Sequence, residues 1–343
     1  RSVPDVVDLL RRMLADPHHN AKRLGRLQRE TVAEVIESRN DDASLAGRAL
    51  RRSLFAGHPH GRFPLGTTTT VPRVELSDLR AHHGRHYGRK TTIFAFSGDI
   101  TDERAARIAE SLAEVLPPEN ESALPPQEPA PRATRHFTLV DKGGRHQTQL
   151  ALGVLGTKPH DEDHTALCVA NTAFGGTFTS RLMQEIRAKR GWSYGASSQL
   201  HASTVREAFC CSAAPAANDA AACLALMVKL IDDWRNDGLN ADELEFCKAY
   251  LRRSYAFEVD TPKKRVQRKL HNMLLGFAPD HDAHYLERLA EVTLAGANDA
   301  VRRRIDPTAL CIAAVASEEE QGSALREALV GLDTSDVLAA DFE

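Results

Sequence analysis

The sequence predicts an α+β protein with two homologous domains, each an antiparallel sheet backed by helices. Three observations carry this prediction. A helix–strand–helix pattern occurs at residues 76–116 and again at residues 297–332. The stretch between the two halves is rich in proline and polar residues, which is typical of a linker. The length of 343 residues also exceeds what one hydrophobic core comfortably holds.

The first half is predicted to be mainly helical, because its apolar residues recur three and four positions apart. A single apolar, β-rich run is expected to form a strand. The predicted helices are residues 4–15, 20–39, 43–55, 76–87 and 102–116, and the predicted strand is residues 91–97. The domain boundaries that follow are residues 1–116 for the N-terminal domain, 117–135 for the linker and 136–343 for the C-terminal domain.

The second half shows strand-like and helical patterns in alternation. Long helices are expected where leucine, methionine and isoleucine repeat at helical spacing, and Asn240 with Glu243 is predicted to form a helix-capping box. The predicted strands are residues 137–140, 147–154, 207–213 and 309–316, and the predicted helices include residues 163–174, 217–237, 297–305 and 321–332.

Composition excludes several classes of protein. The chain is 42% hydrophobic and 27% charged, as in ordinary globular proteins, and its formal net charge of −3 with no long basic block argues against a nucleic-acid footprint. No apolar run reaches the length of a membrane helix. The six cysteines show no C-x-x-C spacing and lie among apolar neighbours, which indicates buried free thiols and leaves the redox compartment open.

The most informative stretch runs from residue 174 to residue 198. A loop with Gly175 and Gly176 leads into a predicted helix, and Gly191 ends that helix before a predicted strand. Side chains alternate in direction along a strand, so Tyr194 is expected to face back towards Arg187 at the end of the helix. The sequence therefore predicts that a guanidinium and a phenol lie close together.

Such a pair can donate hydrogen bonds to a peptide carbonyl and to the oxyanion that develops during hydrolysis. The alternative is a solvated arginine beside a tyrosine half-buried in a sheet. The residues by themselves leave both interpretations open.

The longer pattern G-G-x-x-x-S-R-L-x-x-E-I-R-x-x-x-G-x-x-Y resembles the C-terminal half of the pitrilysin/insulinase (M16) family of zinc peptidases. The resemblance covers nearly the whole chain, as the last part of a first domain that is incomplete at its N-terminus plus a complete second domain. It implies that Arg187 and Tyr194 bind the substrate backbone beside the zinc as catalytic residues, and that Gly175 and Gly176 also bind substrate.

The same resemblance implies a zinc ion in the complete site, with at most one ligand in this chain. An ungapped match from residue 17 to residue 61 places Glu34 at the position of the third zinc ligand and Leu27 where the family has a supporting acidic residue. The inverted zinc motif H-x-x-E-H, with two histidine ligands and a general-base glutamate, occurs nowhere in the chain. The histidine pair His160 and His164 has metal-ligand spacing, but the acidic residues between them favour a helix N-terminus.

These features lead to one functional expectation and two alternatives. The resemblance implies a zinc-dependent metalloendopeptidase acting on peptides or unfolded segments, to which this chain supplies the substrate-binding half. The first alternative is a non-catalytic subunit, and the second is a scaffold protein that kept only the fold. The expected partners are a peptide substrate and a second subunit, in a homodimer or in a heterodimer with a zinc-bearing chain. The chain alone is not expected to hydrolyse peptides.

Overall fold

A computed structural model describes residues 3–118 and 127–343, and in these residues the chain forms two compact units. Of the described residues, the first unit comprises residues 3–35, 65–118 and 257–274. The second comprises residues 36–64, 127–256 and 275–343. Part of the predicted linker, residues 119–126, lies outside the described residues.

The described residues of the first unit are helical or irregular. Its helices are α1 (Val3–Ala15), most of α2 (Ala21–Glu37), α4 (Leu76–His86), α5 (Asp102–Glu114) and α9 (Pro262–Leu274). Helix α1 lies against α5, where Arg11 forms an ion pair with Glu114 at 3.3 Å and a hydrogen bond with Ser111. Much of the apolar face of α1 is nevertheless exposed, since 55% of Val6 and 56% of Met13 face solvent.

The strand predicted at residues 91–97 is wrong, because no residue in 3–118 belongs to a sheet. These residues still alternate in exposure as a strand would, with Phe94 and Phe96 partly covered and Ile93 43% exposed. A strand is defined by backbone pairing with a neighbour, and the described part of this unit supplies none. The apolar pattern is therefore present without the partner that it requires.

The second unit contains a six-stranded sheet in the order β3-β4-β2-β5-β1-β6. Its strands are β1 (His136–Asp141), β2 (Gln149–Leu155), β3 (Ala196–Leu200), β4 (Ala208–Ala213), β5 (Cys311–Ala316) and β6 (Thr334–Ala339). Its helices are α3 (Asp42–Leu54), α6 (His164–Asn171), α7 (Ala220–Asp237), most of α8 (Ala241–Glu258), α10 (Tyr285–Glu291), α11 (Leu294–Arg304) and α12 (Glu318–Glu327).

The α+β architecture is confirmed, but the sheet is mixed and not wholly antiparallel. Strand β2 pairs antiparallel with β4 and β5, and β3 pairs antiparallel with β4. Strand β1 runs parallel to both β5 and β6, with His136 opposite Cys311 and Thr334. Strands β1 and β5 are buried along almost their whole length, as is typical of strands covered on both faces.

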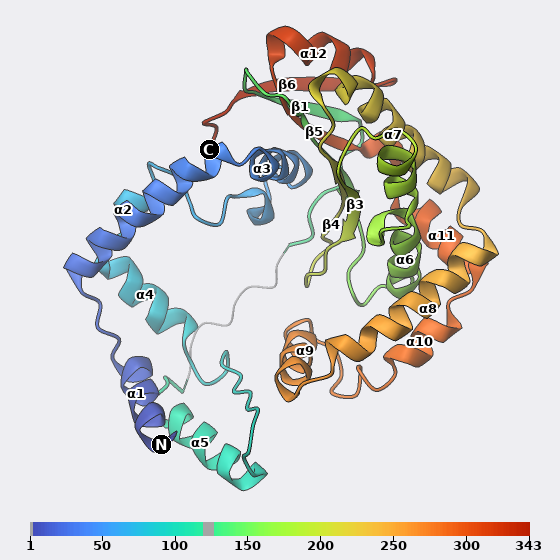
Figure 1. The fold of residues 1–343 in the computed structure, drawn as a ribbon. Coiled ribbons are helices and arrows are strands. Elements are labelled where there is room, and N and C mark those ends of the chain that lie inside the picture. Colours follow the sequence, from blue (N-terminus) through green and yellow to red (C-terminus); the bar gives the residue numbers. More distant parts are fainter. Residues whose placement is uncertain (1–2, 119–126) are drawn as a thin grey trace. The chain divides into compact units, whose positions relative to one another are not determined.

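Helices cover both faces of this sheet (Figure 1). One face packs against α6, α7 and α11, whose buried residues include Leu167, Trp234 and Val301. The opposite face packs against α3 through Leu45 and Ala49. Helix α3 was predicted to belong to the N-terminal domain, yet in space it completes the core of the C-terminal half. Its apolar stripe is buried there because alternate residues of β2 and β5 present apolar side chains to it.

No helix among the described residues combines the length and the apolar character that a membrane crossing needs.

Candidate functional site

The candidate site begins with a cluster of buried aromatic side chains. Phe174 is fully buried and stacks on Trp234 of α7, with ring centroids 4.4 Å apart. Phe209 of β4 packs against the same indole at 5.4 Å. This cluster fixes the chain immediately before the two glycines, so the following loop leaves the core at a defined place.

Two π-helical segments, Thr172–Gly176 and Met183–Ala188, stand on either side of that loop. In the second segment the Lys189 amide donates to the Gln184 carbonyl at 3.0 Å, five residues earlier. Gly191 then takes a φ of 66°, a left-handed conformation that ends the helical stretch. Wide π turns are rare and frequently occur at functional sites, where they redirect side chains.

Gly175 is required by packing. A Cβ built on it would lie 2.3 Å from Ser198 Oγ and 2.4 Å from Ser198 N, so only glycine lets this segment approach β3. Ser198 Oγ also donates to Asn171 Oδ1 at 2.6 Å, which joins the end of α6 to the same strand. Gly176 is exposed, and a Cβ built on it would lie 3.4 Å from its nearest neighbour, the Asn171 carbonyl oxygen. Substrate binding by the two glycines stays a prediction.

Arg181 anchors the helical side of the loop. Its guanidinium forms two hydrogen bonds with Glu243 at 2.6 and 2.7 Å and a third with the Gly238 carbonyl. Glu243 also forms the predicted capping box with Asn240 at the start of α8. Burial of Glu243 works to raise its pKa, but the hydrogen bonds from Arg181 and the Asn240 amide outweigh it and lower that pKa. The sequence predicted the capping box but missed the role of Arg181.

The side chains of Arg187 and Tyr194 lie close together, as predicted. The contact is between the guanidinium of Arg187 and the aromatic ring of Tyr194. The guanidinium carbon of Arg187 lies over the Tyr194 ring, 4.7 Å from its centroid. It also lies 4.7 Å from the centroid of Phe178, a residue that the sequence analysis did not select. The one feature of the sequence that could have indicated a role for Phe178 is its position. It lies in a loop of glycine and threonine residues, which offers an aromatic ring little apolar surface to pack against.

The site is open to solvent. Tyr194 is 86% exposed and Phe178 is 68% exposed, while Arg187 is partly covered by them. Tyr194 was expected to lie in a strand, but β3 begins two residues later, so the ring projects from the turn after Gly191. Among the described residues, neither the Arg187 guanidinium nor the Tyr194 hydroxyl has a hydrogen-bond partner or an ion pair.

The neighbouring cations are paired. Lys189 and Arg190 both bind Glu185, at 2.5 and 2.7 Å. Their hydrogen bonds lower the pKa of Glu185 and keep it ionised. Arg187 is thus the cation of this helical segment whose donors are available to a ligand.

Glu34, the one zinc ligand that the resemblance implies in this chain, has no further metal ligands beside it among the described residues. Glu34 is exposed on α2, and the described parts of the chain contain no group of three or more histidine, cysteine, aspartate or glutamate side chains that could hold a metal ion. Zinc ligands must converge on one point from three or four side chains, so a single carboxylate does not fit this requirement. The complete zinc site implied by the resemblance is therefore not contained in the described residues.

His160 and His164 point to different partners despite their spacing. His160 Nε2 lies 2.7 Å from the Leu275 carbonyl, and His164 Nδ1 lies 2.8 Å from Thr157 Oγ1. The acidic residues between the two histidines were expected to cap the following helix, but Asp163 has a different role. Asp163, which precedes α6, makes no side-chain cap and instead forms a two-pronged ion pair with Arg304 of α11 at 2.8 and 2.9 Å.

The six cysteines are free thiols, as predicted. Burial raises the pKa of Cys168 to about 12 and that of Cys210 to about 11, which keeps them protonated at neutral pH. Cys168 lies 3.6 Å from His164 Nε2, but a buried thiol with a raised pKa is a poor nucleophile.

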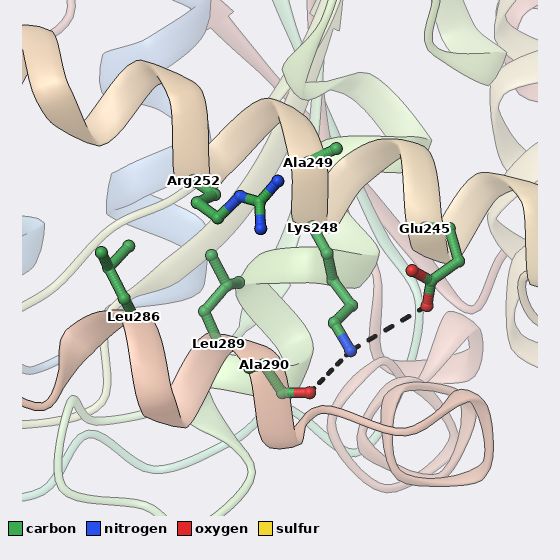
Figure 2. A pocket seen from close by; sticks show the side chains of 7 residues that line it. All are labelled: Glu245, Lys248, Ala249, Arg252, Leu286, Leu289 and Ala290. Atoms are coloured by element: carbon green, nitrogen blue, oxygen red, sulfur yellow. Dashed lines mark hydrogen bonds and ion pairs between the residues drawn. The ribbon is translucent and has the colours of Figure 1, made fainter.

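A pocket of about 270 Å³ lies between α8 and α10 (Figure 2). Lys248 reaches across it and donates to the Ala290 carbonyl at 2.7 Å and to the Val292 carbonyl at 2.9 Å. A lysine that satisfies the last carbonyls of a helix stabilises that helix end. The polar group at the centre of this pocket is therefore already engaged in the fold.

Comparison with known proteins bears on this motif directly. The protein family described as "peptidase M16 inactive domain" matches residues 73–251, slightly more than half of the chain. The chain belongs to the peptidase M16 family. The matched residues of this M16 chain include the whole stretch from Phe174 to Ser198, so the predicted resemblance is confirmed.

Relatives of this M16 chain carry contrasting descriptions. It is 29% identical over 275 residues to an uncharacterized zinc protease from Mycobacterium leprae, a match that covers 79% of this chain and 62% of the relative. It is 20% identical over 320 residues to the non-peptidase homologue YmxG from Helicobacter pylori, covering 92% of this chain and 73% of that protein. The chain therefore spans less than two thirds of the length of the Mycobacterium leprae relative.

A solved structure shows the same fold. The crystal structure of a peptidase M16 inactive domain from Pseudomonas fluorescens superposes with a TM-score of 0.86 at 22% sequence identity. The superposition covers 92% of this M16 chain and 76% of that chain.

Proposed function

We propose that this M16 chain is the substrate-binding half of a peptidase and holds an extended peptide at Arg187 and Tyr194. The observation that carries the proposal is the state of Arg187. Two aromatic rings hold its guanidinium, and among the described residues no acceptor uses its hydrogen-bond donors. Stacking restricts the rotamers of a long side chain, so less conformational entropy is lost when the donors bind a peptide.

The expected chemistry is recognition and polarisation of a backbone carbonyl. Arg187 presents a planar set of N–H donors, and the Tyr194 hydroxyl is a further donor at the same place. In an assembled enzyme both groups would stabilise negative charge that develops on the carbonyl oxygen. The bond-breaking step needs an activated water, and no described residues of this chain form a metal group to supply one.

A non-catalytic subunit is one form of this proposal. The described residues do not fit a zinc ion, and one relative is described as a non-peptidase homologue. The zinc site would then come from a second subunit, in a homodimer or a heterodimer. A longer polypeptide that contains the zinc ligands in cis is the other arrangement, and peptide binding at Arg187 is common to both.

The proposal is tested by measuring peptide binding separately from cleavage. Fluorescence anisotropy with labelled extended peptides should show binding to the purified chain, and Arg187→Ala should weaken it on the order of tenfold. Arg252→Ala, which removes an exposed guanidinium beside the pocket of Figure 2, is the matched control and should leave affinity unchanged. Mass spectrometry of the same mixtures should detect no cleavage. Equal affinity of wild type and Arg187→Ala would refute the proposal.

A further inference from the structure

Charge is unevenly distributed around Arg187. Residues 181–190 contain four cations and one acid. Glu185 is shared by Lys189 and Arg190, and Glu243 from α8 balances Arg181. Counting both acids, two positive charges stay uncompensated in this small region, and the guanidinium of Arg187 has no anionic partner among the described residues.

The two rings determine how a ligand can reach that guanidinium. Its central carbon lies over both Phe178 and Tyr194 at 4.7 Å, so aromatic surface occupies positions where water or an acceptor would otherwise approach it. Hydrogen bonds to a guanidinium form in its plane, along the N–H directions. The ligand group that matches this edge best is planar and offers two oxygens side by side.

We propose that this site selects peptides that carry a carboxylate, and that Phe178 is a positioning residue for this selection. The inference rests on the proposed function, because it assumes that peptides bind at Arg187. A carboxylate accepts two parallel hydrogen bonds from the guanidinium and neutralises its charge, whereas an amide offers one neutral oxygen. Phe178 acts through Arg187: its ring holds the guanidinium in place and excludes water from one approach, which strengthens the ion pair.

Three peptides of otherwise identical sequence test the carboxylate and distinguish its sources. One carries glutamate and an amidated C-terminus, the second carries glutamine with the same amide, and the third carries glutamine with a free C-terminal carboxylate. We expect the glutamate peptide or the free-carboxylate peptide to bind the wild-type chain on the order of tenfold more tightly than the neutral peptide. That ratio should fall between 50 and 500 mM salt, roughly as charge screening predicts.

Variants then separate positioning from folding. Phe178→Leu removes the ring and should lower the ratio of carboxylate to amide affinity towards one, while Phe178→Tyr restores a ring and should restore the ratio. Arg187→Lys keeps the charge but loses the fork and should also lower the ratio. The control is Phe246→Leu on α8, which removes a ring that is 50% exposed and should leave the ratio unchanged. Melting temperatures should agree among all four variants.

The outcomes distinguish a failure of carboxylate selection from a failure of peptide binding at Arg187. Equal affinity for all three peptides, with binding still dependent on Arg187, overturns carboxylate selection and leaves the proposed function standing. An unchanged ratio in Phe178→Leu overturns the role of Phe178. If none of the three peptides binds, both the inference and the proposed function are rejected.

Discussion

At the scale of single residues, Tyr194 combines a large exposed ring with a free hydroxyl. The ring contacts the Arg187 guanidinium, and 86% of the residue faces solvent. Tyr194→Phe removes the hydroxyl and keeps the ring, so the melting temperature should change by less than about 1 °C, as expected for a surface change. If the chain works in a zinc-bearing enzyme as proposed, kcat/KM of that assembly should fall on the order of 100-fold, because a lost oxyanion donor costs about 3 kcal/mol. Unchanged kcat/KM would refute the proposed catalytic role of Tyr194.

His164 provides a residue-scale prediction about pH. Burial lowers the pKa of His164 below its ordinary value of 6.5, although the nearby Asp161 and Asp163 act in the opposite direction and His281 adds to the lowering. Below pH 6.5 the unfolded chain therefore binds a proton that the folded chain does not, so stability falls as the pH drops through this window. Thermal unfolding of the wild type between pH 7.5 and 5.5 should show this loss. His164→Asn, which keeps a hydrogen-bonding group near Thr157, should show a smaller one.

At the scale of elements, the π-helical segment Thr172–Gly176 packs closely against β3 because Gly175 has no side chain. A Cβ on Gly175 would lie 2.3 Å from Ser198 Oγ, a distance that forces the segment and the strand apart. Gly175→Ala should therefore destabilise the protein by about 1–3 kcal/mol, as overpacking does elsewhere, and should weaken peptide binding because the loop carrying Phe178 moves.

Gly176→Ala is the matched control for this prediction. Its nearest contact would be 3.4 Å and its side chain would face solvent, so stability should change by less than about 1 kcal/mol. Chemical unfolding of both variants gives the comparison. Equal midpoints would mean that the close approach of Gly175 to Ser198 does not constrain the fold.

At the scale of the whole molecule, the described residues contain the proposed peptide-binding motif and no group of side chains that could hold a metal ion. We predict that the purified chain retains well below one equivalent of zinc after dialysis against a chelator, since a tight site needs three or four converging ligands. Elemental analysis measures this directly. Glu34→Gln should leave the zinc content unchanged, because Glu34 is exposed and belongs to no metal-ligand group among residues 3–118 and 127–343. Stoichiometric zinc that is lost in Glu34→Gln would show that the carboxylate is a ligand after all.

Local patterns predicted most of the helices and most of the second-half strands, but not β6 (Thr334–Ala339). The helix at residues 217–237 and the strand at residues 309–316 were predicted within a few positions of α7 and β5. Apolar periodicity reports which face of an element is buried, and that information is contained in neighbouring residues. The proximity of Arg187 and Tyr194 was predictable for the same reason, since only seven positions separate them in the chain.

By itself the sequence determined the α+β class, the M16 resemblance and the central pair of the candidate site. Only the tertiary structure decided the parallel pairing of β1, the packing of α3 on the C-terminal sheet and the irregular, non-strand conformation of residues 91–97. It also decided that Phe178 contacts Arg187 and that Glu34 belongs to no metal-ligand group within the part of the chain that the structure describes. The physical reason is common to all of these. Strand pairing, helix docking and ligand convergence depend on segments far apart in the chain, and local periodicity carries no information about which distant segment becomes the neighbour.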